Sequence, residues 1–349
     1  MIEFKYLQIK DIEAIEYVTF YEKYHGKDSF RERRERIRWY FCSEGYKLLI
    51  AVVDGKYVGQ SCAYKTTAII NGQSCEWWWG VDGFVLEEMR GKGVGKALQR
   101  KLHEDCPNFS SASYSAVNGF IKRKLGDHEI MSYHQYYCPT SCFVSLYVEL
   151  VLKKILSRSV RFPRIRLPYF YSLIAGLKGK TDYKVHELTK EDFNDQLSGF
   201  IEDNLRNTGF HIQRTTDYIK WKYLKNPSIK YGALDVMKDG QRVGVIFYTN
   251  AYNGEFVVSK ARVCKILDSV IKVDSTLSQK ELIVILMNHF KSKGVKLDGV
   301  LTLIPSTYWP QIKYPMPGSI RMLSMMDIDK IEDGYLAYSD QDMEQMYER

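Results

Sequence analysis

Hydrophobic and polar positions at the start of the chain follow strand and helix periodicities in turn. Residues 2–9 alternate and predict an edge strand. Asp11 can cap a helix whose apolar positions recur over residues 12–18, and a second helix is expected over about residues 30–42. The chain therefore begins with a strand that is followed by two helices.

The next segment is rich in residues that favour β-strands and contains two hairpin signals. Asp54-Gly55 and Asn71-Gly72 are typical of two-residue turns between antiparallel strands. The expected elements are strands over about 47–53, 57–66, 64–70 and 74–86, a glycine-rich turn at 90–95, a helix over 94–104, a strand over 109–114, a helix over 117–125 and a strand over 129–137. This order predicts a mixed α/β unit of about 140 residues.

The rest of the chain divides into a connector and an echo of the first unit. Residues 143–180 begin as an amphipathic helix and continue as a loop with prolines and basic residues. Residues 181–349 then repeat the order of the first unit, with a capping-box-like start at Thr189 and Asp192, a hairpin at Asp239-Gly240, a helix over about 278–293 and a strand over 299–304. We therefore expect an α/β fold with two mixed, twisted sheets flanked by helices, divided into domains over residues 1–142 and 181–349.

The composition agrees with two folded domains. The chain has 349 residues, of which 45% are hydrophobic, and this is enough to bury two ordinary cores. An aromatic content of 14% excludes a disordered protein. Trp77, Trp78 and Trp79 stand in a row, and strand alternation places Trp78 on one face of a sheet and its two neighbours on the other.

The formal net charge of +8 indicates an anionic partner, such as a phosphorylated metabolite. The densest basic cluster, Arg31 to Arg38, includes Glu32 and Glu35, which is typical of a solvated helix face. The sequence has no zinc finger, basic-region helix or RNA-recognition signature, so a nucleic acid partner is not expected.

Neither cysteine usage nor hydropathy indicates a metal site or a membrane segment. The seven cysteines are irregularly spaced, and the CxxxC pair Cys138 and Cys142 lacks a second ligand pair, so free thiols and no metal are expected. The N-terminus has no signal-peptide pattern, and the most apolar stretch, residues 142–156, contains three charged residues. We expect a soluble, cytoplasmic protein.

The informative motif lies at residues 85–98, where Arg-Gly-x-Gly-x-Gly precedes Ala97 and Leu98. Glycines at this turn leave backbone N–H groups open, and the dipole of the following helix favours a pyrophosphate. The dinucleotide fingerprint does not fit, because the turn follows an antiparallel meander and the third glycine comes too early. The P-loop pattern is absent from the sequence.

Residues 81–98 resemble motif A of the GNAT (GCN5-related N-acyltransferase) superfamily, V-x-P-x-x-R-G-x-G-x-G, with Glu87 in place of the proline. The resemblance implies that the strand before the turn splays from its parallel neighbour and that acyl-CoA lies in the gap. Pantetheine would pair with backbone around Phe84 and Val85 and contact Asn118. The pyrophosphate would lie on the turn and the start of the helix, at Arg90, Gly91, Lys92, Gly93, Val94, Gly95 and Lys96.

A closer resemblance covers most of the chain. Residues 81–85 and 217–227 are similar to segments of tandem-GNAT proteins from polysaccharide gene clusters, with Lys222 in place of an Arg. Some members are sugar N-acyltransferases that acylate a dTDP-linked dideoxy aminosugar, often with 3-hydroxyacyl groups. The second domain would be a degenerate GNAT fold that contributes to the acceptor site. No Arg-Gly-x-Gly turn follows residue 180, so one acyl-CoA site is expected.

Amide formation from a thioester requires a general base and a donor for the tetrahedral oxyanion. Asp82, eight residues before Arg90, is the first candidate for the base, and Glu76, earlier on the same strand, is the second. Either carboxylate can instead be structural. The amide of Phe84 or Val85 would polarise the carbonyl. The family's tyrosine position holds Lys122, which we expect on a helix surface, so the general acid is unassigned.

The resemblance also suggests residues for the acceptor. Trp79, Tyr133, His134, Trp221 and Tyr223 are candidates for substrate binding, and packing in a core or interface is the alternative for each. The sequence thus predicts an acyl-CoA-dependent N-acyltransferase in surface polysaccharide biosynthesis. An N-acetyltransferase of an amino acid or antibiotic amine, or a silent acyl-CoA-binding module, is the alternative. The sugar, the amine position, the acyl chain and the formation of a homodimer are left open.

Overall fold

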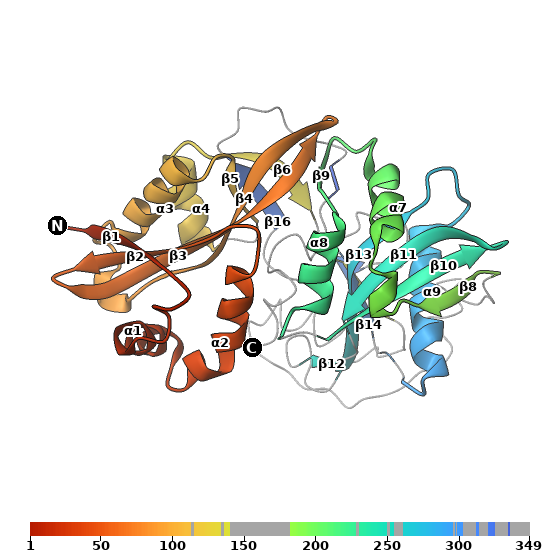
Figure 1. Ribbon diagram of the computed structural model, residues 1–349, viewed down its shortest axis with the longest axis horizontal. Helices are drawn as coiled ribbons and strands as arrows, with labels where there is room; N and C mark the ends of the chain where they lie inside the picture. Colours follow the sequence, from red (N-terminus) through yellow and green to blue (C-terminus); the bar gives the residue numbers. More distant parts are fainter. Residues whose placement is uncertain are drawn as a thin grey trace. The chain divides into compact units, whose positions relative to one another are not determined.

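The computed structural model of the chain is shown in Figure 1. It describes residues 1–112, 115–133, 136–139, 182–227, 230–249, 252–254, 261–295, 297, 299–302, 312–313, 320–324 and 334–335. The chain forms two compact units. The first contains residues 1–132, 207–228 and 321–335, and the second contains residues 133–206, 229–320 and 336–349. Each unit therefore combines segments from both halves of the sequence.

The first unit is built on an eight-stranded mixed sheet with the order β1-β2-β3-β4-β5-β16-β6, and β9 pairs with β3. The strands are β1 (Glu3–Leu7), β2 (Tyr46–Val53), β3 (Lys56–Ile70), β4 (Gln73–Val85), β5 (Phe109–Ala112), β16 (Ile320–Ser324), β6 (His128–Tyr133) and β9 (Phe210–Ile212). Strands β1 to β4 form an antiparallel meander, and β4 pairs with β5 in parallel.

Both expected hairpins are present at the ends of β3. Asp54 and Gly55 have φ values of 49° and 72°, as a two-residue turn of the hairpin type requires. Strand β3 runs without a break for 15 residues, so the two strands expected over 57–66 and 64–70 are one. Its pairing has two register shifts, one opposite β2 and another opposite β4.

Helices cover both faces of this sheet (Figure 1). Helices α1 (Ile15–His25) and α2 (Ser29–Phe41) lie on one face, and α3 (Val94–Asp105) and α4 (Ala116–Lys124) lie on the other. Trp78 packs with α3 in a buried cluster that includes Leu98, Leu102 and Phe109. Trp77 contacts Phe210 of β9 instead. The alternating faces expected for the tryptophan run are therefore confirmed.

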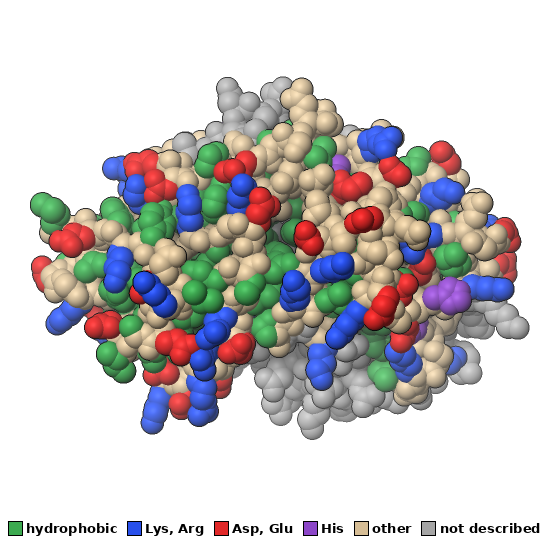
Figure 2. Space-filling model, viewed as in Figure 1, with side chains coloured by type: hydrophobic (Ala, Val, Ile, Leu, Met, Phe, Trp, Pro, Cys, Tyr) green, Lys and Arg blue, Asp and Glu red, His purple; other side chains and the backbone are tan. Residues whose placement is uncertain are grey.

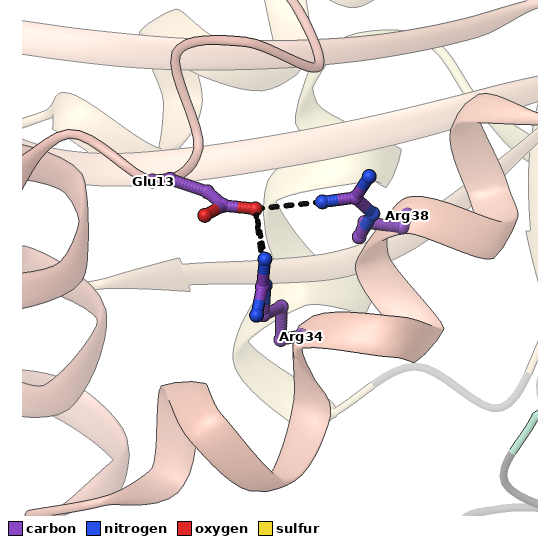
Figure 3. Close-up of polar contacts among 3 residues, drawn as sticks. All are labelled: Glu13, Arg34 and Arg38. Carbon is purple, nitrogen blue, oxygen red and sulfur yellow. Dashed lines mark hydrogen bonds and ion pairs between the residues drawn. The ribbon is translucent and has the colours of Figure 1, made fainter.

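The basic cluster of the sequence lies on α2, and an acidic residue partly neutralises it. Glu13 Oε1 accepts hydrogen bonds from Arg34 at 2.6 Å and from Arg38 at 2.7 Å, and so ties the start of α1 to α2 (Figure 3). Lys, Arg, Asp and Glu are interspersed over the described residues on the face drawn in Figure 2. Asp11 does not cap α1, because that helix begins at Ile15 and the Asp11 carboxylate accepts from the N–H of Gln8.

Two later segments complete the first unit. Strand β9 extends the sheet at the end of β3, and the helical turns α8 (Thr216–Ile219) and η3 (Lys220–Leu224) follow it. Trp221 stacks on Trp39 with ring centroids 4.4 Å apart, and each indole N–H donates to the other residue's carbonyl oxygen. Strand β16 lies between β5 and β6.

The segment expected as one strand over residues 129–137 is two strands in different sheets. Strand β6 ends at Tyr133 in the first sheet, and β7 (Tyr136–Pro139) pairs with β14 and β15 in the second. Continuous β-rich sequence cannot reveal such a crossing, because both strands have the same local preference. The single-strand prediction is therefore wrong.

The second unit has its own eight-stranded sheet with the order β15-β7-β14-β13-β11-β10-β8, and β12 pairs with β13. Its elements are β8 (Lys184–Glu187), η2 (Lys190–Asp192), α7 (Asp195–Leu205), β10 (Tyr231–Lys238), β11 (Gln241–Thr249), β12 (Tyr252–Gly254), β13 (Ala261–Ile271), α9 (Gln279–Ser292), β14 (Gly299–Thr302) and β15 (Ile312–Lys313). Capping boxes at Thr189–Asp192 and Ser278–Glu281 begin η2 and α9.

The two sheets share one topology. In each, an antiparallel meander leads through a helix into a parallel strand: β4 and β5 through α3, and β13 and β14 through α9. In each, the next strand comes from the other half of the chain, β16 in the first sheet and β7 in the second. The expected α/β class with two mixed sheets flanked by helices is confirmed, and the halves exchange one strand. None of the described helices has the length and hydropathy of a membrane-spanning segment.

Candidate functional site

The glycine-rich turn joins the end of β4 to the start of α3. A short 3-10 helix, η1 (Glu87–Met89), follows β4. Gly93 is the N-cap residue of α3, so no side chain caps this helix. Gly91 and Gly93 have φ values of 77° and 82°, a region that other residues rarely adopt. The two glycines therefore make possible the sharp entry into the helix that the motif predicts.

The backbone N–H groups of this turn are available to a ligand. Among the described residues, no acceptor receives a hydrogen bond from the N–H of Gly91, Gly93, Val94, Gly95 or Lys96. A Cβ atom added to Gly91 or Gly93 would meet nothing within 4 Å, so the space above the turn is open. Open N–H groups at a helix N-terminus bind anions, and the helix dipole adds to the attraction. The exposed side chains of Arg90, Lys92 and Lys96 add positive charge nearby.

The parallel pair beside the turn separates, as the sequence predicts. Among the described residues, strands β4 and β5 pair at Trp78 with Phe109 and at Trp79 with Ser110 and at no further position. At Gly80 the strands are still close, since an added Cβ would lie 2.7 Å from the Phe109 ring. Beyond it, Val81, Phe84 and Val85 pair with β3, and residues 81–85 have no partner among the described residues 109–112 of β5. This edge of β4 can therefore pair with an extended ligand that reaches the turn.

Asp82 lies at a β-bulge where β4 leaves its neighbour. The register between β3 and β4 shifts between Gln60 and Cys62, so that two residues of β4, Asp82 and Gly83, face one residue of β3. Asp82 has a φ of 45°, which is uncommon for a residue other than glycine. Bulges of this kind redirect a side chain and occur next to active sites.

A chain of hydrogen bonds between buried side chains links the Asp82 carboxylate to α1. Gln60 Nε2 donates to the carbonyl oxygen of Asp82 at 3.0 Å and to its Oδ2 at 3.1 Å. Tyr17 donates its hydroxyl hydrogen to Gln60 Oε1 at 3.1 Å. Burial raises the pKa of Tyr17 well above its usual value, and the nearby Cys62 and Asp82 raise it further. Tyr17 is therefore a neutral hydrogen-bond donor.

The other candidate base, Glu76, lies in a different environment. Its carboxylate accepts a hydrogen bond from Trp78 Nε1 at 2.7 Å and lies 3.1 Å from Lys65 Nζ. These two contacts, that of Trp78 first, lower the pKa of Glu76. Six residues of strand separate it from Asp82, which is about 20 Å. The structure thus places only Asp82 at the bulge, and the catalytic role of either carboxylate stays a prediction.

Lys122 differs from its expected position on a helix surface. Its side chain is fully buried, with Nζ 3.5 Å from Asp127 Oδ2 and 4.1 Å from the centre of the Phe109 ring. Burial lowers the pKa of Lys122 to about 8, although Asp127 opposes the shift. The surface prediction is wrong because the chain turns back after α4 and brings Asp127 under the helix. Asn118, at the start of α4, donates its backbone N–H to Ser115 Oγ, and its contact with pantetheine stays a prediction.

The candidates for substrate binding lie in several places. Trp79 is fully buried. Trp221 and Tyr223 are buried in η3, where the Trp221 ring stacks on Trp39. His134 and the side chain of Tyr133 lie outside the described residues. Core packing accounts for the buried rings, and contact with a substrate stays a prediction for all five.

A row of aromatic side chains on α1, which the sequence analysis did not identify, packs against Phe84, next to the bulge. Phe84 stacks between Tyr24, at 4.1 Å between ring centroids, and Phe20, at 5.2 Å. Tyr21 meets Phe84 edge-on. The α1 residues Tyr17, Phe20, Tyr21 and Tyr24 recur at positions i, i+3, i+4 and i+7. This helical periodicity was the signal that could have identified them.

A metal site does not emerge from the described part of the chain. There, no group of three or more His, Cys, Asp and Glu side chains lies close enough to hold a metal ion. Five cysteines are free thiols, namely Cys42, Cys62, Cys75, Cys106 and Cys264. The CxxxC pair, Cys138 and Cys142, falls on side chains that are not described.

Comparison with known proteins agrees with this geometry. Residues 9–118, which include strands β2 to β4, the bulge and the glycine-rich turn, match the model of the acetyltransferase (GNAT) family. The match covers 110 of the 349 residues, so it shows a similarity of this part of the chain to the family. No curated protein sequence is significantly similar to the chain.

Solved structures resemble the whole chain in fold. A protein of unknown function from Enterococcus faecalis V583, described as a probable N-acyltransferase, is 13% identical with a TM-score of 0.60, covering 93% of this chain and 72% of its own. A GCN5-related N-acetyltransferase from Anabaena variabilis ATCC 29413 is 14% identical with a TM-score of 0.59, covering 93% and 72%. Saccharomyces cerevisiae N-myristoyltransferase with bound myristoyl-CoA is 12% identical with a TM-score of 0.55, covering 94% and 84%.

Proposed function

We propose that this chain is an N-acyltransferase that uses acyl-CoA and acylates an amine. The observation that carries the proposal is the combination of open N–H groups at residues 91 and 93–96 with the edge of β4 at residues 81–85, which has no partner among the described residues of β5. The first suits a pyrophosphate and the second suits an extended amide-containing chain, and acyl-CoA contains both. The match to the GNAT family over residues 9–118 and the bound myristoyl-CoA of a structural neighbour support it.

In the proposed reaction, the free amine attacks the thioester carbonyl and Asp82 accepts the proton that the nitrogen loses. The C–N bond forms, the C–S bond breaks, and CoA leaves as the thiolate. Backbone N–H groups near Phe84 and Val85 would stabilise the oxyanion of the tetrahedral intermediate. The bulge supports this assignment, because it brings the Asp82 carboxylate to the part of β4 that lacks a partner on β5.

For the acceptor, we propose the amine of a dTDP-linked dideoxy aminosugar in surface polysaccharide biosynthesis, with 3-hydroxyacyl among the acyl groups. The similarity of residues 217–227 to tandem-GNAT sugar acyltransferases supports this choice, and the net charge of +8 fits two diphosphate substrates. In this proposal residues 1–142 form the catalytic domain and residues 181–349 contribute to the acceptor site.

The experiment is a thiol-release assay with acetyl-CoA or 3-hydroxybutyryl-CoA and a panel of amines. Release that depends on a dTDP-aminosugar supports the full proposal. Release with an amino acid or antibiotic amine alone would keep the acyltransferase and replace the acceptor. CoA binding without release in the presence of any amine would indicate a silent acyl-CoA-binding module.

A further inference from the structure

One buried side chain, that of Gln60, donates hydrogen bonds both to the backbone carbonyl oxygen and to the carboxylate of Asp82. Gln60 Nε2 donates to the backbone oxygen at 3.0 Å and to carboxylate Oδ2 at 3.1 Å. Gln60 lies on β3, where it pairs with Phe84 next to the bulge, and is only 1% exposed. A left-handed conformation at a residue other than glycine is strained and therefore carries an energetic cost. The two hydrogen bonds from Gln60 offset that cost and select one orientation of the carboxylate.

The orientation of Gln60 is itself fixed from α1. Tyr17, which is also 1% exposed, donates its hydroxyl hydrogen to Gln60 Oε1 at 3.1 Å. With Oε1 engaged by Tyr17, the amide of Gln60 presents Nε2 to Asp82. A flip of the amide would place Oε1 against the carbonyl and carboxylate oxygens of Asp82, so that buried acceptors would face each other, which is unfavourable. Tyr17, Gln60 and Asp82 therefore form a chain of hydrogen bonds with a defined direction.

This hydrogen-bond network leaves one carboxylate oxygen of Asp82 available to accept a proton. Oδ2 accepts from Gln60, whereas Oδ1 accepts no hydrogen bond from the described residues. The Asp82 side chain is half-buried, so this oxygen can meet a ligand. A general base must be placed within hydrogen-bond reach of the proton that it removes, and a displacement of about 1 Å can cost a hundredfold in rate.

We propose that Gln60, held by Tyr17, is the positioning residue that aims Oδ1 of Asp82 at the reacting amine. The proposal rests on the proposed function, in which Asp82 is the base. Gln60 contacts neither the amine nor acyl-CoA, and acts only through the orientation of Asp82. Its loss should therefore slow the chemical step without weakening the binding of acyl-CoA.

The test is steady-state kinetics of Gln60→Met, which keeps the length of the side chain and removes both hydrogen bonds to Asp82. We expect kcat to fall by about ten- to a hundredfold, with the KM for acyl-CoA unchanged. Tyr17→Phe should give a smaller loss of the same kind, because Gln60 can still reach Asp82 but is free to rotate. Gln60→Glu places a second carboxylate beside Asp82, so the acid limb of its pH–rate profile should move to higher pH.

Gln99→Met is the matched control. Gln99 is a buried glutamine whose Nε2 donates at 3.0 Å to Ser61 Oγ, on the next residue of β3 and the other face of the sheet. The Gln99→Met variant loses a comparable hydrogen bond at a side chain that does not contact Asp82. Its kcat should therefore stay near that of the unchanged protein. Equal losses of kcat in the two Met variants would overturn the proposal, because Gln60 would then be only structural.

A double-mutant cycle with Asp82→Asn separates the proposal from the function on which it rests. If Gln60 acts through Asp82, Gln60→Met should add little to the loss in Asp82→Asn. The same fold-loss in both backgrounds would overturn the positioning role and leave the base in place. If Asp82→Asn itself turns over normally, the proposed base is wrong. Should Gln60→Met fail to fold, Tyr17→Phe and Gln60→Glu carry the same comparison.

Discussion

Asp82 combines an uncommon backbone conformation with a carboxylate that has one engaged and one available oxygen. Its φ of 45° and its bond from Gln60 come from the bulge. The sequence could locate Asp82 from its spacing to Arg90. It could not reveal the bulge, because a bulge is a property of the register between β3 and β4 and not of either strand alone.

At the same scale, Asp82→Asn should keep the shape of the site and remove the base. We expect kcat to fall by about 10²–10⁴-fold, the usual range for a general base. The affinity for CoA should hardly change, because the turn at residues 90–95 is unaltered. Activity should recover in part at high pH, where more of the amine is unprotonated. A pH series of initial rates checks this, and near-normal turnover at pH 7 would remove Asp82 from the mechanism.

Among the elements, those with local turn chemistry were the most predictable. Asp54-Gly55 and Asn71-Gly72 mark their hairpins, and the glycine-rich turn marks the start of α3. The length of β3 was less predictable, because no breaker separates the two β-rich runs that it contains. The burial of Lys122 was not predictable, since it depends on Asp127 and on packing against Phe109 of β5.

The contact between α3, α4 and the following loop makes stability depend on pH. Burial, and then the nearby Lys122, lowers the pKa of His103 from its usual 6.5 to about 3. The folded chain therefore holds His103 neutral, whereas the unfolded chain protonates it below pH 6.5. The stability that His103 contributes is fully present above pH 6.5 and is lost as pH falls toward 3.

Urea denaturation of the unchanged protein and of His103→Asn checks this at a series of pH values. The raised pKa of Asp127, which comes from its burial, acts in the opposite direction, and because His103 Nε2 lies 3.5 Å from Asp127 Oδ1, the difference between the two curves reports on His103 together with this contact. The unchanged protein should lose more stability between pH 6.5 and 4 than the variant. Parallel curves would show that His103 is not buried as a neutral imidazole.

For the whole molecule, the exchange of segments between the halves is the main feature that the sequence concealed. Strand β9, the Trp221 turn and β16 come from later in the chain but complete the first unit. The duplication itself was visible, because each half repeats a hairpin and a helix–strand pair. The exchange was not, because β7 and β16 have no local signal that names their sheet.

A fragment of residues 1–142 should therefore not fold stably. It lacks the partner of Trp39, the strand that pairs with residues 68–70 and the strand between β5 and β6. Exposed strand edges and a buried tryptophan left without its stacking partner favour aggregation. Circular dichroism and thermal melting of the fragment and the full chain provide the measurement. A fragment that melts cooperatively near the temperature of the full chain would contradict the interleaved units.

The central claim is that the turn at residues 90–95 binds the pyrophosphate of CoA, and calorimetry of Gly93→Val with CoA tests it most directly. Valine at a φ of 82° strains the turn, and relief of that strain should displace the N–H groups that bind the pyrophosphate. Gly72→Val is the matched control, because Gly72 also has a positive φ and open space but lies in the hairpin at the other end of β3. We expect CoA affinity to fall at least tenfold in Gly93→Val and to stay unchanged in Gly72→Val. Unchanged affinity in a folded Gly93→Val protein would contradict the assignment of the site.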